Sequence, residues 1–166
     1  MLRLLLGTSV LLASTVSALA GFDRWTTSVE KDPFSGGERV TVDMSTSIRS
    51  GIIIFCDTAE NGVAVRAIPG FTFDDSLVGV SPKMEFAVDG ERITGGTGQA
   101  GAVGDNLATA EVRLMRAAAL QLVEAFAAAK NQIAVKDGIS DRPYLLSVRG
   151  STKAGVALQD CMSKQK

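Results

Sequence analysis

Much of the chain alternates apolar and polar positions with the period of two that is typical of β-strands. Val40, Val42 and Met44 alternate with Thr41 and Asp43, which predicts a half-buried strand. Similar patterns predict further strands at residues 63–67, 84–88 and 144–148. Strands are also expected at 91–94, as the return after the Asp89-Gly90 turn, and at 132–135. Turn residues separate these segments, so the chain is expected to form antiparallel sheets.

One apolar run lacks this alternation. Ile52 to Cys56 is continuously apolar and mostly β-branched, which predicts a central strand buried on both faces. Glu60-Asn61-Gly62 follows it as a hairpin turn that leads into the next strand.

The alanine-rich stretch from Arg113 to Val135 is the strongest helical signal. Its apolar residues recur at helical spacing on one face, formed by Met115, Ala118, Leu122, Phe126 and Ala129. The helix is expected to end at Lys130-Asn131. Leu107 to Leu114 has two interpretations: a separate strand, which is favoured, or a backward extension of the helix.

These elements predict an α+β domain, in which antiparallel sheets form a sandwich and one amphipathic helix packs across them. No second helix of comparable strength is expected. Trp25 is expected to anchor the first segment after residue 20 as its one large apolar side chain. Gly95 to Gly104 is predicted to be a glycine-rich loop, and Gly150 to Lys153 is predicted to be a turn. The tail, Met162 to Lys166, is expected to fray.

Residues 1–20 have the pattern of a signal peptide. Arg3 precedes the mostly apolar run Leu4–Leu12, and Ala18 and Ala20 form the A-x-A pattern that signal peptidase accepts. The alternative, a transmembrane anchor, is disfavoured because a span needs about 20 apolar residues. Residues 21–166 are then a single exported domain, periplasmic or secreted, without stable membrane insertion.

The two cysteines, Cys56 and Cys161, are expected to form a disulfide, because an exported chain meets an oxidising compartment. There is no C-x-x-C motif. Closing a loop of roughly one hundred residues stabilises the fold by roughly 4–5 kcal/mol in the chain-entropy model.

The charge balance argues against nucleic acid as a partner. Without Arg3, the 17 basic residues become 16 against 18 acidic ones, a net charge of −2. Binding to nucleic acid or to an anionic membrane calls instead for a clustered basic surface.

The sequence contains no histidine, which excludes Ser-His-Asp and Cys-His catalysis and histidine-ligated zinc. Ser151 and Lys153 lack the S-x-x-K spacing of a Ser–Lys pair. Gly96 to Gly101 matches G-x-G-x-x-G, but no helix follows to receive a phosphate, so a mobile connection is favoured.

Several carboxylates could serve as acid and base or bind calcium. The candidates are Asp74-Asp75, Asp89, Glu91 and the pair Asp137 and Asp141. None has the spacing of a calcium loop, and solvated turn acids are the more common explanation. No catalytic, cofactor-binding or metal-binding residue is therefore predicted.

A set of features recurs in order along the chain: Trp25, the Asp32-Pro33 turn, the strand Ile52–Cys56, Phe86–Asp89, the block Ala119–Phe126 leading to Ile133–Val135, Gly150 and Cys161. This order resembles small exported bacterial proteins of the invasion-associated locus B and type VI secretion-associated VasI kind. The resemblance implies a periplasmic β-sandwich with one packed helix and an accessory role through protein contacts. It implies no catalytic residues.

Three functions follow as hypotheses. The first is a non-enzymatic envelope protein that binds another protein, through exposed strand edges or the Gly95–Gly104 loop. The second is a carrier of a small apolar ligand, held between helix and sheet near Leu122, Phe126 and Phe86. The third is a hydrolase that uses the carboxylates of Asp74 and Asp75. The sequence does not determine the oligomeric state.

Overall fold

The computed structural model describes residues 22–34 and 36–165, so the predicted signal peptide lies outside the described residues. The larger of two antiparallel sheets has the strand order β1-β2-β3-β4-β8-β7. Its strands are β1 (Thr26–Lys31), β2 (Glu38–Ser45), β3 (Gly51–Asp57), β4 (Val63–Ile68), β7 (Gln99–Val103) and β8 (Leu107–Leu114). The prediction of an α+β fold with antiparallel sheets is confirmed.

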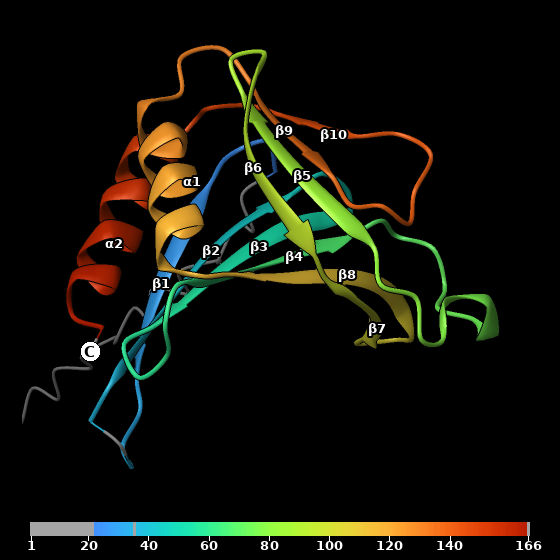
Figure 1. The fold of residues 1–166 in the computed structure, drawn as a ribbon, viewed down its shortest axis with the longest axis horizontal. Coiled ribbons are helices and arrows are strands. Elements are labelled where there is room, and N and C mark those ends of the chain that lie inside the picture. Colours follow the sequence, from blue (N-terminus) through green and yellow to red (C-terminus); the bar gives the residue numbers. More distant parts are fainter. Residues whose placement is uncertain (1–21, 35, 166) are drawn as a thin grey trace, which may run out of the picture.

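The smaller sheet has the order β10-β9-β5-β6. Its strands are β5 (Lys83–Val88), β6 (Glu91–Thr97), β9 (Ile133–Lys136) and β10 (Tyr144–Leu146), and a short 3-10 helix, η1 (Asp75–Leu77), precedes it. Figure 1 shows this sheet and the helices side by side over the same face of the larger sheet, so the domain has two layers with the core between them.

The predicted helix is α1 (Arg116–Ala128), and β8 ends directly before it, so the strand interpretation of residues 107–114 is confirmed. The buried residues of α1 are Ala119, Leu122, Val123 and Phe126. Met115, expected on the apolar face, is instead the exposed N-cap. Trp25 is buried as expected: its ring meets Phe126 edge-on at 4.8 Å, and its indole N–H donates to the Ser147 carbonyl.

The expectation of a single helix is wrong, because α2 (Ser151–Ser163) follows Gly150 where a turn and an irregular segment were predicted. Gly155 lies in the middle of α2, which lowers helix propensity. A Cβ at Gly155 would lie only 2.5 Å from the Cβ of Ala127. The glycine therefore lets α1 and α2 pack closely, and the tertiary contact stabilises a helix that local propensity disfavours.

The predicted disulfide joins Cys56 on β3 to Cys161 on α2, with both residues buried. Residues 162–165 of the C-terminal tail are also fixed, contrary to the expected fraying. The Gln165 side chain is 8% exposed and inserts its amide into the β3–β4 hairpin. It donates to the carbonyls of Gly62 (2.7 Å) and Asp57 (3.0 Å), and it accepts from the Gly62 N–H. These bonds attach the end of α2 to the larger sheet.

The glycine-rich stretch from Gly95 to Gly104 is also not the predicted loop, because it forms the end of β6 and all of β7. A Cβ at Gly96 would lie 2.9 Å from a methyl of Val112, and one at Gly98 would lie 2.1 Å from the Glu111 carbonyl oxygen. Both partners belong to β8. The glycines are needed because the chain passes from the smaller sheet to the larger one directly against β8.

Candidate functional site

The candidate site is an apolar groove on the outer face of the larger sheet. Among the described residues, the helices and the smaller sheet pack on the other face (Figure 1). The groove has a volume of about 300 Å³. Its apolar side chains on the outer face are Ile48, Ile53, Phe55, Ile68 and Leu107. Met44 and Ile52 also border it, but their side chains are buried in the core on the other face. We call this feature the outer-face groove.

Strand β3 supplies the apolar side chains that are partly exposed on the outer face of the sheet. Its burial alternates: Ile52, Ile54 and Cys56 are buried toward the helices, whereas Ile53 and Phe55 are only half-buried on the opposite face. The prediction of burial on both faces is therefore wrong. The strand is central within its sheet, but the domain has only two layers, so half of this apolar run faces outward.

The β2–β3 turn forms one wall of the groove and presents Ile48, which is 94% exposed. Hydroxyl groups order this turn, because Ser50 Oγ lies 2.7 Å from both Thr46 Oγ1 and Ser47 Oγ. The backbone N–H groups of Thr46 and Ser47 donate to the Ser50 carbonyl. The exposed isoleucine thus projects from a hydrogen-bonded turn.

Next to the groove, the outer face carries a stripe of ion pairs. The pairs join neighbouring strands and the β3–β4 turn: Arg39 with Asp57, Arg66 with Glu111, and Arg113 with Glu60. The Arg66 guanidinium also lies over the Phe55 ring, 5.1 Å from its centre. Exposed pairs of this kind contribute about 0–1 kcal/mol each. The stripe is charge-balanced and leaves the apolar groove as the distinctive feature of this face.

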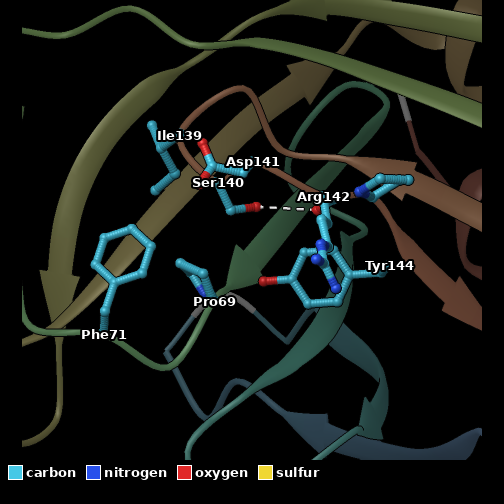
Figure 2. A pocket seen from close by; sticks show the side chains of 8 residues that line it. Pro69, Phe71, Ile139, Ser140, Asp141, Arg142 and Tyr144 are labelled. Carbon is cyan, nitrogen blue, oxygen red and sulfur yellow. Dashed lines mark hydrogen bonds between the residues drawn. The ribbon is translucent and has the colours of Figure 1, made fainter.

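A second, more polar pocket of about 450 Å³ lies between the end of β4 and the β9–β10 connection. Figure 2 shows its lining residues, which are Pro69, Phe71, Ile139, Ser140, Asp141, Arg142, Pro143 and Tyr144. Burial, and next the charge of Asp137, raise the pKa of the Tyr144 hydroxyl well above its ordinary value. The phenol is thus a neutral wall of the pocket at physiological pH and is not poised to act as a base.

Asp137 was expected to be a solvated turn acid, and this is wrong because its side chain is 0% exposed. Its carboxylate accepts hydrogen bonds from the N–H groups of Ile139 (3.0 Å) and Ser140 (2.8 Å) and from the Ser140 hydroxyl. Gly138 is in the left-handed region at φ +77°. These contacts organise the β9–β10 connection, so Asp137 has a structural role at this position.

The other predicted carboxylates do not come together in one site. Asp74 caps η1: its carboxylate accepts from the Ser76 hydroxyl and N–H, which lowers the pKa of Asp74. Asp75 is in the first turn of η1, Glu91 begins β6, and Asp141 lines the polar pocket. Of the two residues of the hydrolase hypothesis, Asp74 is thus engaged in capping η1, and Asp75 lies in the turn that it caps.

Asp89 binds the segment that follows α1. Its carboxylate accepts from the N–H groups of Lys130 (2.9 Å), Asn131 (2.7 Å) and Gln132 (3.0 Å), and these bonds lower the pKa of Asp89. The side chain thus occupies a concave set of N–H groups that would otherwise suit an anion. Asp89 connects the β5–β6 turn to the end of α1.

The remaining predicted motifs have structural explanations. Ser151 is buried whereas Lys153 is exposed, although both are in the first turn of α2, so they do not form a Ser–Lys pair. The G-x-G-x-x-G match lies in β6 and β7, without a helix start. Leu122, Phe126 and Phe86 are buried in the packed core, and other residues line both the outer-face groove and the polar pocket.

Within residues 22–34 and 36–165, no three or more His, Cys, Asp or Glu side chains are grouped as metal ligands would be. The helices of this same part of the chain are too short or too polar to cross a membrane. Searches with the whole sequence and structure match no protein-family model, no curated protein and no solved structure.

Proposed function

We propose that this protein is a non-enzymatic accessory protein of the bacterial envelope that acts by binding proteins through the outer-face groove. Its place outside the cytoplasm is supported by the buried Cys56–Cys161 disulfide and by the signal-peptide pattern of residues 1–20. The spacing resemblance to small periplasmic accessory proteins supports the same assignment.

The observation that carries this proposal is the exposed half of an apolar strand. Ile53 and Phe55 lie on the outer face of β3, with Ile68 and Leu107 beside them and the exposed Ile48 at the rim. Contiguous apolar surface that is rimmed by polar groups is typical of an interaction site. The neighbouring ion pairs would form the polar rim of such an interface.

The size of the groove defines what it can bind. A volume of about 300 Å³ is at the lower end of the range for small-molecule pockets. The groove is open and lies on a sheet face, so it suits one or two large apolar side chains of a protein partner. Burying such a side chain contributes about 1.5–3 kcal/mol, which fits a modest and reversible interaction.

The test is a crosslinked pull-down of residues 21–166 from the native cell envelope, with wild type and Ile53→Ser compared side by side. Val156→Ser is the matched control, because Val156 is 56% exposed on α2 and does not line the groove. We expect Ile53→Ser to lose the captured protein and Val156→Ser to retain it. Equal capture by all three proteins, or capture of nothing by folded wild type, would contradict the proposal.

A further inference from the structure

We infer that the outer-face groove accepts the β1–β2 hairpin of a second copy of this chain, with Phe34 as the inserted side chain. The inference rests on the proposed protein-binding role of the groove and names its occupant. The resulting contact is head-to-tail: the hairpin of one copy meets the groove of the next.

The hairpin presents Phe34 as an anchor. This side chain is 97% exposed and follows Pro33 at the turn, which projects beyond the two layers in Figure 1. The turn is hydrogen-bonded: the Phe34 N–H donates to the Asp32 carboxylate (2.9 Å), and the Gly36 N–H donates to the Asp32 carbonyl (2.9 Å). A preformed turn loses less entropy on binding than a flexible one, so Phe34 is placed for insertion.

The groove is complementary to this side chain in chemistry and size. Ile53, Ile68 and Leu107 supply an aliphatic lining, and Ile48 supplies a wall beside it. A volume of about 300 Å³ accommodates a single phenyl ring together with the proline before it. Aromatic anchors in apolar hollows are common centres of protein interfaces.

The charges beside the two surfaces are also complementary. Glu30 and Asp32 flank Lys31 just before the tip of the hairpin, and Arg49 lies on the turn that forms the rim of the groove. Among the described residues, neither Glu30 nor Arg49 takes part in an ion pair with another side chain. The groove lining also includes Asp43, whose carboxylate accepts from the Thr26 hydroxyl (2.6 Å). The Arg49 guanidinium at the rim is then the charged group that would meet the Glu30 carboxylate of an incoming hairpin.

The β1–β2 hairpin of one copy cannot reach the outer-face groove of the same copy. Strand β2 runs from Glu38 beside the hairpin to Ser45 beside the groove, and eight residues of extended strand span roughly 25 Å. The hairpin and the groove are thus fixed at opposite ends of the same strand. Because the two contact surfaces differ, repeated association gives an open chain or a closed ring, and it does not stop at a symmetric dimer.

The experiment is analytical ultracentrifugation of residues 21–166, oxidised and at increasing concentration, with wild type, Phe34→Ser and Ile53→Ser. We expect the mean mass of wild type to rise with concentration. Each variant should associate roughly 10- to 100-fold more weakly, as the loss of one buried aromatic or aliphatic side chain implies. Phe71→Ser is the control, since Phe71 is exposed but lines the polar pocket, and it should associate as wild type does.

Mixing the two variants gives the decisive result. The Ile53→Ser chain keeps an intact Phe34, and the Phe34→Ser chain keeps an intact groove, so an equimolar mixture should form dimers and nothing larger. A charge reversal supplies a second test on exposed residues: Arg49→Glu should weaken association, and Glu30→Arg in the same chain should restore it. Both residues are exposed, so these variants are expected to fold.

Three outcomes would overturn the inference: a wild type that stays monomeric at millimolar concentration, a Phe34→Ser variant that associates as wild type does, or a mixture that remains monomeric. The proposed function fails separately, through the pull-down. If, in the pull-down, Ile53→Ser loses the captured protein and Phe34→Ser retains it, the groove binds a protein and its occupant is not the hairpin of a second copy.

Discussion

Strand β3 is apolar on both of its faces, but only one of them is covered. On β3, Ile54 points toward the helices and is buried, whereas Ile53, its neighbour in the chain, lines the open groove. The helix-side face is held by a disulfide, by the amide of Gln165 and by the close contact of Gly155 with Ala127. The outer face has none of these attachments among the described residues. Apolar character alone therefore does not distinguish the covered face from the open one in this domain.

The largest expected effect on stability comes from the Cys56–Cys161 disulfide, which links the covered face of the sheet to α2. Replacing both Cys56 and Cys161 by alanine removes a bridge across 105 residues of chain, and the free energy of unfolding should fall by roughly 4–5 kcal/mol. Guanidinium unfolding followed by Trp25 fluorescence measures the change. A loss below about 1 kcal/mol would mean that packing alone holds α2 on the sheet and would weaken the contrast between the two faces.

Matched substitutions on adjacent residues test the contrast directly. Ile54→Ala should cost about 2–5 kcal/mol of unfolding free energy, because it leaves a cavity in a buried core. Ile53→Ala should cost less than about 1 kcal/mol, because solvent reaches the site on the outer face. The same guanidinium titration serves for both variants. Equal costs would show that the outer face is as important to stability as the core, which argues against a free contact surface.

Removing the hydrogen bonds that attach Gln165 to the larger sheet should lower the free energy of unfolding by an intermediate amount. Gln165→Ala removes hydrogen bonds to Gly62 and Asp57 and leaves buried backbone groups unpaired, so we expect a loss of about 1–3 kcal/mol. Gln99→Ala on β7 is the matched control: its side chain is exposed, and its change should stay within about 0.5 kcal/mol. If the two variants lose equal stability, the tail does not help to hold the covered face.

The smallest expected effect depends on pH and concerns the end of α1. Because hydrogen bonds lower the pKa of Asp89 in the folded protein, its carboxylate stabilises the fold above the unfolded pKa of about 3.9. This contribution is lost as the pH falls through the lower, folded pKa. Asp89→Asn should therefore lower the thermal midpoint at pH 7, with a difference from wild type that narrows below about pH 4.

Circular dichroism melts at pH 7 and pH 3 measure this effect, with Asp141→Asn as the control on an exposed aspartate. Asparagine tolerates the positive φ of +52° at residue 89, so the substitution tests the charge and leaves the turn conformation intact. A difference that is independent of pH would indicate that the carboxylate charge is not what matters.

Much of the fold followed from local pattern. Period-two alternation located β2, β4, β5 and β10, and the alanine-rich face located α1, because these residues bury one side of a regular element. The two cysteines, together with the signal-peptide pattern, predicted the disulfide. Helix α2 was missed, because Gly155 in its middle is unfavourable for a helix locally and is explained only by its close contact with Ala127.

The glycines in and between β6 and β7 are a second case in which the local sequence pattern predicted the wrong structure. Taken alone, Gly95, Gly96 and Gly98 are typical of a loop. In the fold, Gly95 and Gly96 lie where β6 passes close to Met84 and Val112, and Gly98 lies between β6 and β7, close to Glu111. Likewise, Asp137 and Asp141 are aspartates of the same loop and look alike in the sequence. In the structure Asp137 is buried and hydrogen-bonded to backbone N–H groups, whereas Asp141 is exposed. Burial depends on residues distant in the chain, so no local pattern distinguishes the two.

By itself, the sequence determined the class of the fold, the strands with alternating residues and the first helix, because each of these depends on spacing along the chain. It also predicted the disulfide, from two cysteines that follow a signal-peptide pattern. The tertiary structure alone decided which face of β3 is covered, since that depends on the number of layers packed against the sheet. Two layers cover Ile52, Ile54 and Cys56 and leave Ile53 and Phe55 facing outward. An apolar run that is typical of a buried strand thus supplies both the core and the outer-face groove.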